Sequence, residues 1–236
     1  MKNNAHTEWF ALLSSLEHII PVYENMNKRM SLGLLARIRM KLLDSIRENP
    51  SILVDIGCGP GITGYSMLKL GKTQHVVFVD PSSRMLKVAS FFIKRKDMDA
   101  KADFIIAVAE YLPIREGSVN AVTATFSIRD TFNLPRALRS VLSILKPSGK
   151  FYILDLYKPA STLLRIALDI YWFTMPRLVS IISNKKLYRE YGKLHETFRK
   201  FPTVLEISSL ASNSGGKTLW ERVFLGAVLI IIEKLN

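Results

Sequence analysis

Cysteine is almost absent from this chain: Cys58 is the only one among 236 residues. A framework of disulfides is therefore excluded, which agrees with a reducing compartment such as the cytoplasm. No histidine stands beside Cys58 in the sequence, so we do not expect a thiol nucleophile. The four histidines are dispersed and make no metal-ligand spacing with that cysteine, so we predict no bound metal.

A hydrophobic run long enough to cross a bilayer is also missing. The longest charge-free apolar run near the carboxyl end, residues 223–232, is about half the length that a spanning helix needs. Residues 1–20 do not resemble a secretion signal, because Glu8 and Glu17 interrupt their apolar stretch. We expect a cytoplasmic protein that is either free or peripheral at a membrane surface.

Acidic residues are scarce relative to basic ones, 20 against 33, and the net charge is +13. This balance favours an anionic partner, either RNA or an acidic membrane surface. The basic residues are spread along the chain without a recognisable RNA-binding motif, so nucleic acid is not the expected partner. A hydrophobic content of 48% is typical of a globular protein with a large core.

Strand and helix patterns alternate through the middle of the chain. Short β-prone runs predict buried strands, and the segments between them show helical periodicity. The first predicted strand begins at residue 52 and ends at a glycine-rich segment. The other predicted strands are 76–80, 104–108, 119–125 and 150–156. The predicted helices between them are 62–70, 81–96 and 135–145. A turn is expected at 146–149. This alternation implies an α/β fold with a parallel sheet and right-handed crossovers.

Helical segments flank this central pattern. Before the central pattern, the predicted helices are 8–20 and 24–47, separated by Pro21. After it, a very apolar helical stretch is predicted at 160–183, followed by two further helices at 185–199 and 203–213. Two last strands, 218–224 and 227–233, are expected to join at residues 225–226 as an antiparallel hairpin at the sheet edge. We expect one domain over 1–236, with an amino-terminal helical extension of about 1–47 and a helical insertion of about 160–200.

The glycine-rich segment after the first strand is the most informative feature. Asp55 is followed by three alternating glycines, Gly57, Gly59 and Gly61. Because glycine has no Cβ, such a turn can pass close to a ligand. Gly59, Gly61 and Gly64 also satisfy the dinucleotide pattern GxGxxG, so the loop alone does not choose between a nicotinamide and an adenosyl cofactor.

Asp80 follows the second predicted strand, far enough along the chain to meet a ribose bound at the loop. Its two carboxylate oxygens can accept hydrogen bonds from both ribose hydroxyls. The structural alternative is that Asp80 caps the helix that begins at Pro81.

Several features together resemble the class I S-adenosylmethionine-dependent methyltransferases. They are Asp55 before the first glycine, Asp80, an Ala-Glu-x-Leu-Pro segment at 109–113 and a Leu-Lys-Pro-x-Gly segment at 145–149. The resemblance implies a Rossmann-like, mostly parallel seven-stranded sheet with helices on both faces and an antiparallel carboxyl-terminal hairpin. It also implies that the glycine loop approaches the methionine part of the cofactor, that Asp80 binds the ribose, and that the loop after the third strand borders the adenine.

Within that superfamily the chain resembles the UbiE-like ubiquinone/menaquinone biosynthesis C-methyltransferases. The resemblance rests on residues 23–33, 126–130, 137–140, 145–149, 153–159 and 188–202. It covers nearly the whole chain except the first 20 residues. It implies an enzyme that transfers a methyl group from S-adenosyl-L-methionine to a ring carbon of a small-molecule or lipid quinone precursor, leaving S-adenosyl-L-homocysteine.

The resemblance carries roles to specific residues. Cofactor contacts are implied for Asp55, Gly57, Gly59, Gly61, Asp80, Val108, Ala109, Glu110 and Thr125. Catalytic roles are implied for Arg129, Asp130 and Tyr23. The chain departs from the family in having Arg129-Asp130 where Arg-Asn is usual, and Gly64 where a threonine is usual.

Chemistry constrains how such residues would act. Arginine is a poor base because it stays protonated, so Asp130 or a water oriented by Arg129 is the better candidate to remove a proton from a phenolic ring. The structural alternative is a surface ion pair between Arg129 and Asp130 that stabilises the exit of the strand. His195, in a polar predicted helix, is expected to be solvated.

Three further questions stay open from the sequence. The acceptor could be another small molecule or RNA, and a relative that binds an adenosyl ligand without turnover is the non-enzymatic alternative. The apolar 160–183 stretch could be a lid at a membrane surface, with Arg165, Arg177, Lys185 and Lys186 near lipid headgroups, or a helix pair buried against the sheet or in a homodimer.

Overall fold

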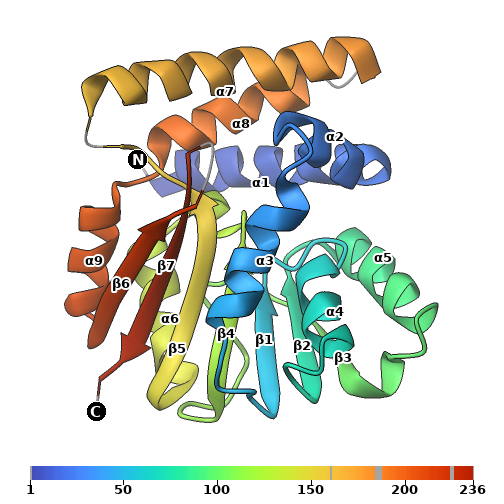
Figure 1. The fold of residues 1–236 in the computed structure, drawn as a ribbon, viewed down its shortest axis with the longest axis vertical. Coiled ribbons are helices and arrows are strands. Elements are labelled where there is room, and N and C mark those ends of the chain that lie inside the picture. The colour runs from blue at the N-terminus through green and yellow to red at the C-terminus, as the bar shows by residue number, and fades with distance from the viewer. Residues whose placement is uncertain (1, 160, 184–187, 224–225, 236) are drawn as a thin grey trace.

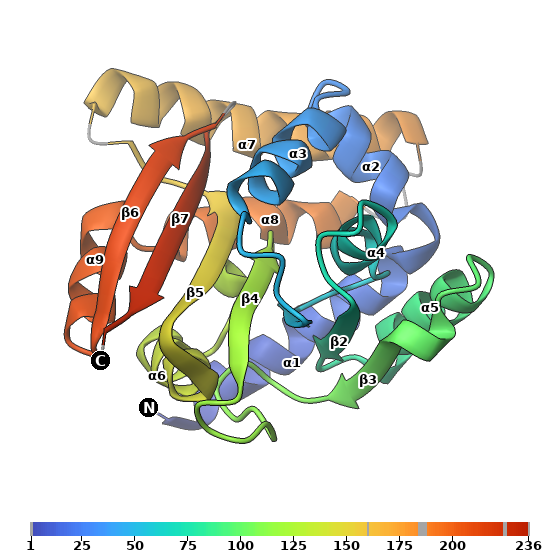
Figure 2. The ribbon, with the colours of Figure 1, turned by 60° about the horizontal axis from the view of Figure 1, so that its bottom comes forward.

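The computed structural model describes residues 2–159, 161–183, 188–223 and 226–235. A seven-stranded sheet with the order β3-β2-β1-β4-β5-β7-β6 forms its centre, with β3 at one edge and β6 at the other (Figure 2). Its strands are β1 (Ile52–Ile56), β2 (His75–Asp80), β3 (Ala102–Ile106), β4 (Val119–Thr125), β5 (Leu145–Leu156), β6 (Gly216–Arg222) and β7 (Ala227–Lys234). The first five strands pair in parallel, and β7 is antiparallel to both β5 and β6. The predicted fold class is confirmed.

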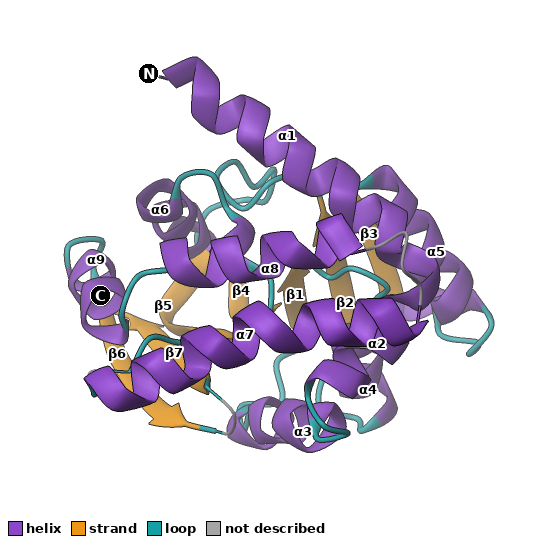
Figure 3. Cartoon of the chain, turned by 90° about the horizontal axis from the view of Figure 1, so that it is seen from above, coloured by secondary structure: helices purple, strands orange, loops and turns teal. Residues whose placement is uncertain are grey.

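The helices form a layer on each face of the sheet and a third group over one end of it (Figure 1). One face carries α3 (Leu35–Ser45), α4 (Ile62–Lys69) and α5 (Ser83–Lys94), and the other carries α6 (Leu134–Ile144) and α9 (Val204–Ser212). The third group, α1 (Lys2–Ile19), α2 (Tyr23–Met30), α7 (Thr162–Ser183) and α8 (Tyr188–Lys200), lies over the carboxyl ends of the parallel strands (Figure 3). We call this third group the helical cap. Within the described ranges, three short 3-10 helices connect the elements: η1 (Ile20–Val22), η2 (Asp99–Lys101) and η3 (Ile128–Asp130).

Alternation along the buried strands creates a core on each face. Val54 and Ile56 of β1 pack toward α6 and α9, whereas Leu53 packs toward α3, α4 and α5. Parallel strands that are covered on both faces read as continuous apolar runs for this reason. A third cluster, which includes Met26 of α2 and Trp172 of α7, holds the cap together.

The strand order reverses between β1 and β4, which are both central and parallel. In open α/β sheets this reversal leaves a crevice beyond the carboxyl ends of the strands, and ligands bind there. The glycine loop, the end of β2 and the end of β4 all open toward that crevice, directly under the cap.

Two predicted elements differ from the structure. The predicted helix 24–47 is wrong as a single element: α2 ends at Met30, Leu32 and Gly33 take positive φ of 52° and 80°, and α3 begins at Leu35. The Ser31 hydroxyl accepts the Leu35 amide at 3.1 Å and so closes this turn. The predicted turn 146–149 lies inside β5, where the pairing with β4 shifts register.

The carboxyl-terminal predictions are confirmed in outline. β6 and β7 pair in antiparallel fashion, with Thr218 opposite Ile232, although β6 begins at residue 216 and not at 218. Residue 225 of the predicted connection at 225–226 lies outside the described residues. Residues 185–187, at the start of the predicted helix 185–199, also lie outside them. No helix in the described ranges combines the length and the hydropathy that a membrane crossing requires.

Candidate active site

The glycine loop between β1 and α4 has a left-handed backbone at each of the three predicted glycines. The φ angles are 59° at Gly57, 53° at Gly59 and 80° at Gly61. A Cβ on Gly57 would lie 2.4 Å from the Cβ of Ser127, so the loop needs glycine there in order to pack against the end of β4. A Cβ on Gly59 would meet no atom within 4 Å, because Gly59 faces open space. The loop therefore leaves room for a ligand at Gly59.

Asp55 lies beneath this loop and anchors it. Its side chain accepts a hydrogen bond from the Thr123 hydroxyl at 2.8 Å and another from the Gly64 amide at 3.1 Å. Burial raises the pKa of this carboxyl to about 6, against the lowering effect of those two hydrogen bonds. Asp55 thus ties β1 to β4 and to the first turn of α4.

Asp80 lies beside the loop at the end of β2, with a 6% exposed surface. Its carboxylate accepts the Gly59 amide and the Ser82 amide, each at 2.9 Å. Burial raises the pKa of Asp80 to about 6. Each oxygen keeps a lone pair for a further donor such as a hydroxyl. The helix cap is Ser82, whose hydroxyl accepts the Met85 amide at 3.1 Å, so the capping alternative for Asp80 is wrong.

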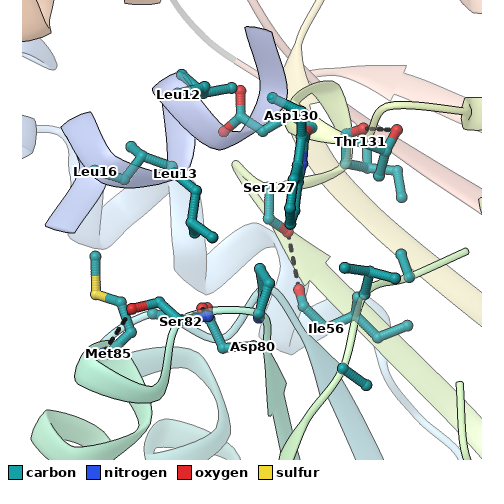
Figure 4. A pocket seen from close by; sticks show the side chains of 18 of the residues that line it. Leu12, Leu13, Leu16, Ile56, Asp80, Ser82, Met85, Ser127, Asp130 and Thr131 are labelled. Carbon is teal, nitrogen blue, oxygen red and sulfur yellow. Dashed lines mark hydrogen bonds between the residues drawn. The ribbon is translucent and has the colours of Figure 1, made fainter. Parts of the chain in front are cut away.

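A cavity opens above Gly59 and Asp80, with about 820 Å³ of empty space that is partly open to solvent. We call it the loop cavity. In Figure 4, Leu12, Leu13 and Leu16 of α1 face Asp80 and Ser82 across it. Its lining is completed by Trp9, Tyr23, Ile56, Gly57, Pro81, Met85, Ala107, Val108, Ala109, Glu110, Phe126, Ser127, Ile128, Asp130 and Thr131. The sheet side of the lining therefore mixes apolar side chains with the polar groups of Asp80, Ser82 and Glu110, whereas α1 contributes an apolar wall opposite them.

A second cavity, of about 760 Å³, lies farther under the cap. We call it the cap cavity. It is lined by Leu12, Ser15, Leu16, Ile19, Tyr23, Asn27, Met30, Ser31, Leu35, Phe126, Arg129, Asp130, Leu156, Trp172 and Thr197. Tyr23, Phe126 and Asp130 border both cavities, so the two spaces adjoin at these residues.

Arg129 and Asp130, on η3, sit at this junction and are shielded from solvent. Their side chains are 8% and 16% exposed, so the alternative of a surface ion pair is wrong. Arg129 Nη1 lies 2.6 Å from Asp155 Oδ1, whereas Arg129 Nε lies 3.7 Å from Asp130 Oδ1. Burial alone would lower the pKa of Arg129, but Asp155 and Asp130 outweigh it and raise that pKa, so the positive charge is permanent.

Burial raises the pKa of both groups next to Arg129, Asp130 and Tyr23. It raises the pKa of Asp130 to about 6, although the Arg129 charge counteracts it. Burial also raises the pKa of Tyr23, which therefore stays protonated. The Trp9 indole donates to the Asp130 backbone carbonyl at 3.0 Å and holds α1 against this site. Near neutral pH the junction thus holds a fixed cation, a carboxylate and a phenol.

A small polar cavity, of about 300 Å³, lies on the other side of the glycine loop. Arg39 of α3 lines it and forms a two-pronged ion pair with Glu24 at 2.8 and 2.9 Å. Its Nε is buried and has no hydrogen-bond partner among the described residues. The Thr63 hydroxyl donates to the Thr125 hydroxyl at 3.2 Å on the same lining.

The structure places most predicted cofactor residues along these linings. Val108, Ala109 and Glu110 border the loop cavity, and Glu110 also accepts the Asn133 amide at 2.9 Å. Asp55 and Thr125 border the polar cavity. Gly61 does not line these three cavities; it is the N-cap residue that directly precedes α4.

Two features of the site were not predicted. The chain has glycine at 64, where the family usually has threonine, because a Cβ there would lie 2.4 Å from the Phe78 ring. A hydroxyl is still present next to it, on Thr63. The apolar wall supplied by α1 was also missed, although the spacing of Leu12 and Leu16 by four residues was the signal for a covered helix face.

His195 is not solvated, so that prediction is wrong. It is 9% exposed and its Nε2 lies 2.9 Å from Asp169 Oδ1, between α7 and α8. Among the described residues, no three His, Cys, Asp or Glu side chains gather as a metal site would require. Burial raises the pKa of the Cys58 thiol well above its ordinary value, which disfavours a thiolate there.

Residues 11–231 match the ubiE/COQ5 methyltransferase family. The chain belongs to this family. It is similar to the ubiquinone/menaquinone biosynthesis C-methyltransferase UbiE of Pseudomonas aeruginosa, with 31% identity over 82% of this chain and 76% of that protein. The UbiE of Idiomarina loihiensis is 28% identical over 89% of this chain and 84% of that protein. The match begins at residue 11, so the prediction that the first 20 residues lie outside the resemblance is wrong for residues 11–20.

The fold comparison agrees with this ubiE/COQ5 membership. A solved S-adenosylmethionine-dependent methyltransferase from Aquifex aeolicus superposes with a TM-score of 0.60 at 13% identity, over 89% of this chain and 98% of that one. The chain is a methyltransferase that uses S-adenosyl-L-methionine. The site fits that cofactor, because Gly59 leaves open space beside the buried Asp80 carboxylate.

Proposed function

We propose that this ubiE/COQ5 family member methylates a ring carbon of a quinone or quinol precursor. The proposal is carried by one observation: Asp130 and Tyr23 border both the loop cavity and the cap cavity. A methyl donor in the first space and an aromatic acceptor in the second would meet at these residues. The UbiE relatives are named for C-methylation in ubiquinone and menaquinone biosynthesis, which supports this acceptor class.

The cofactor would lie along the glycine loop. Asp80 would accept the ribose hydroxyls, and Val108, Ala109 and Glu110 would border the adenine. The methionine part would extend toward the polar cavity, where the unpaired Nε of Arg39 suits a carboxylate. When bound, S-adenosyl-L-methionine supplies a methyl group on a cationic sulfur, and S-adenosyl-L-homocysteine remains after transfer.

The residues at the junction would activate the acceptor. Asp130, with a pKa of about 6, is ionised at neutral pH and takes the proton of a ring hydroxyl, directly or through a water. Arg129 keeps its charge and stabilises the phenolate that forms. Tyr23 stays protonated and can donate a hydrogen bond. The ring carbon beside the phenolate would form the new bond to the methyl carbon as the bond from that carbon to the cofactor sulfur breaks, and its own proton would pass to solvent water when the ring becomes aromatic again.

The proposed reaction is tested with methyl-labelled cofactor and two acceptor pools, a polyprenyl naphthoquinol in detergent micelles and total RNA. We expect label in the quinol fraction. Asp130→Asn should lower turnover by about 100-fold or more, with unchanged affinity for S-adenosylhomocysteine. The matched control is Asp103→Asn, since Asp103 is exposed and its partner is His75.

Other outcomes of this experiment would point elsewhere. Label in the RNA fraction alone would replace the acceptor. If neither fraction carries label although the protein binds S-adenosylhomocysteine, the result would favour a relative without turnover. Full activity of Asp130→Asn would remove Asp130 from the mechanism.

We further propose that the helical segments within about 1–47 and 160–200 act as a cap on a single methyltransferase domain, and that α7 docks on an anionic lipid surface. The outward side of α7 exposes Leu163, Leu164, Ile166, Ile170, Phe173, Leu178, Ile181 and Ile182. Arg165 and Arg177 lie on the same helix, whereas Lys185 and Lys186 fall outside the described residues. An apolar helix face with basic neighbours is typical of membrane-surface helices, and the net charge of +13 favours an anionic membrane. A homodimer interface at this face is the competing outcome.

A further inference from the structure

The indole N–H of Trp172 is a buried donor without a partner. Trp172 lies on the inner side of α7, is 7% exposed, and lines the cap cavity. Its Nε1 has no hydrogen-bond partner among the residues that the structure describes. Tyr171 and Phe198 contact it only through their rings, at centroid distances of 5.3 and 6.4 Å. Buried tryptophan N–H groups usually find an acceptor, so this one calls for an explanation.

The other two tryptophans have no such deficit. Trp9 donates its N–H to the Asp130 carbonyl at 3.0 Å. Trp220, on β6, is 43% exposed and can donate to water. The Tyr171 hydroxyl, next to Trp172, donates to the Met30 carbonyl at 2.6 Å. The unpaired donor is therefore specific to the tryptophan that borders the cap cavity.

The chemistry of the cap cavity indicates what could pair with this donor. Eight of its fifteen lining residues are apolar, and among the described residues its only charged side chains are Arg129 and Asp130. An occupant that buries a flat apolar ring and presents an oxygen would match both the lining and the free N–H. A hydrocarbon ring would fill the space and leave the N–H unpaired.

We propose that Trp172 is a specificity-determining residue, whose N–H donates a hydrogen bond to a ring oxygen of the methyl acceptor. This inference rests on the proposed function, because it assumes that the acceptor occupies the cap cavity. The acceptor class is then an oxygenated aromatic ring, a hydroquinone or phenol. Sites built around a hydrogen bond reject analogues that lack the matching group, because the buried donor is then left unpaired.

The test replaces Trp172 with β-(3-benzothienyl)alanine, which keeps the shape of the indole and puts sulfur in place of the N–H. Two probes, 1,4-naphthohydroquinone and naphthalene, are titrated calorimetrically into protein saturated with S-adenosylhomocysteine. We expect the wild-type preference for the hydroquinone to fall by about tenfold in the variant, while naphthalene affinity stays unchanged. The same replacement at the exposed Trp220 is the control and should change neither affinity.

Stability provides a second readout. Since the N–H has no partner in the free protein, its removal should leave the thermal midpoint unchanged or higher. A clearly lower midpoint would mean that the N–H is already paired and would overturn the inference. So would an unchanged preference between the two probes. Loss of S-adenosylhomocysteine binding by the wild-type protein would instead overturn the proposed function, so the two failures are distinguishable.

A conventional variant covers the case in which the analogue does not fold. Trp172→Phe keeps an aromatic ring and removes the N–H. We expect the KM for a quinol acceptor to rise by about tenfold or more while kcat is largely retained, because a hydrogen bond made equally in the bound and transition states affects binding alone. A tenfold fall of kcat with an unchanged KM would contradict the assignment.

Discussion

Asp155 holds Arg129 at two points. The Arg129 Nη1 lies 2.6 Å from one carboxylate oxygen of Asp155, and the Arg129 backbone amide donates to the other at 3.3 Å. Asp155 comes from β5 and its side chain is fully buried. Asp130 is the neighbour of Arg129 in sequence but is the more distant acid in space. Arg129 is thus anchored by the sheet, and Asp130 is left available to the cavities.

The first prediction concerns this anchor. Asp155→Asn leaves the Arg129 charge buried with only Asp130 nearby. We expect the free energy of unfolding to fall by about 3–5 kcal/mol, as for other broken buried ion pairs. Urea unfolding measures the change. Asp103→Asn, which breaks an exposed pair with His75, should cost less than about 1 kcal/mol. Equal losses for the two variants would contradict a special role for Asp155.

The second prediction concerns the pH dependence of turnover. As the proposed base, Asp130 would act only when it is ionised, and burial raises its pKa to about 6. We therefore expect kcat, at saturating cofactor, to rise with pH through about 6 and then to level off. The pH profile of the remaining activity of Asp130→Asn should lack this step. A step of the same position and size in that variant would assign it to another group.

The third prediction concerns the pH dependence of cofactor binding. As the proposed ribose ligand, the Asp80 carboxylate would accept ribose hydroxyls best when ionised, and burial raises its pKa to about 6. The affinity for S-adenosylhomocysteine should therefore weaken as the pH falls below about 6. Asp80→Asn should bind more weakly throughout, and its affinity should vary less with pH. Calorimetry at several pH values separates this effect from that of Asp130, which is seen in turnover.

The fourth prediction contrasts two glycines of one loop. Both have positive φ, but a methyl group on Gly59 meets open space, whereas one on Gly57 would collide with Ser127. Gly59→Ala should cost only about 1–2 kcal/mol of stability and should abolish measurable cofactor binding, because the methyl group enters the loop cavity. Gly57→Ala should unfold at clearly lower urea concentration. Retained cofactor affinity in folded Gly59→Ala would place the ligand elsewhere.

The fifth prediction concerns the outward side of α7. A triple change of Leu163, Ile166 and Ile170 to glutamine should abolish co-sedimentation with vesicles that contain anionic phospholipid, while cofactor binding persists. The control changes two exposed leucines elsewhere, Leu205→Gln and Leu219→Gln, which should leave vesicle binding intact. A dimer in solution that the triple change converts to a monomer would instead identify this face as a subunit interface.

Local patterns in the sequence were sufficient for much of the framework. The β-prone runs, the alternating glycines of 57–61 and the acid at 80 are local features of the sequence, so the strands, the glycine loop and an acid at the end of β2 could be predicted without a structure. The turn at 31–34 escaped recognition because Leu32 takes a positive φ of 52°, which leucine rarely adopts. The burial of His195 escaped because its partner, Asp169, lies on another helix.

Contacts between distant segments could come only from the folded chain. Arg129 pairs with Asp155, 26 residues away, because β5 lies beside β4, and the Trp9 indole reaches Asp130 across 121 residues. The same packing leaves the Trp172 N–H unpaired beside the cap cavity and makes glycine necessary at 64, against Phe78. Backbone propensity and periodicity act over a few residues, whereas the pairing of buried charges and donors depends on which segments the sheet and the cap bring together.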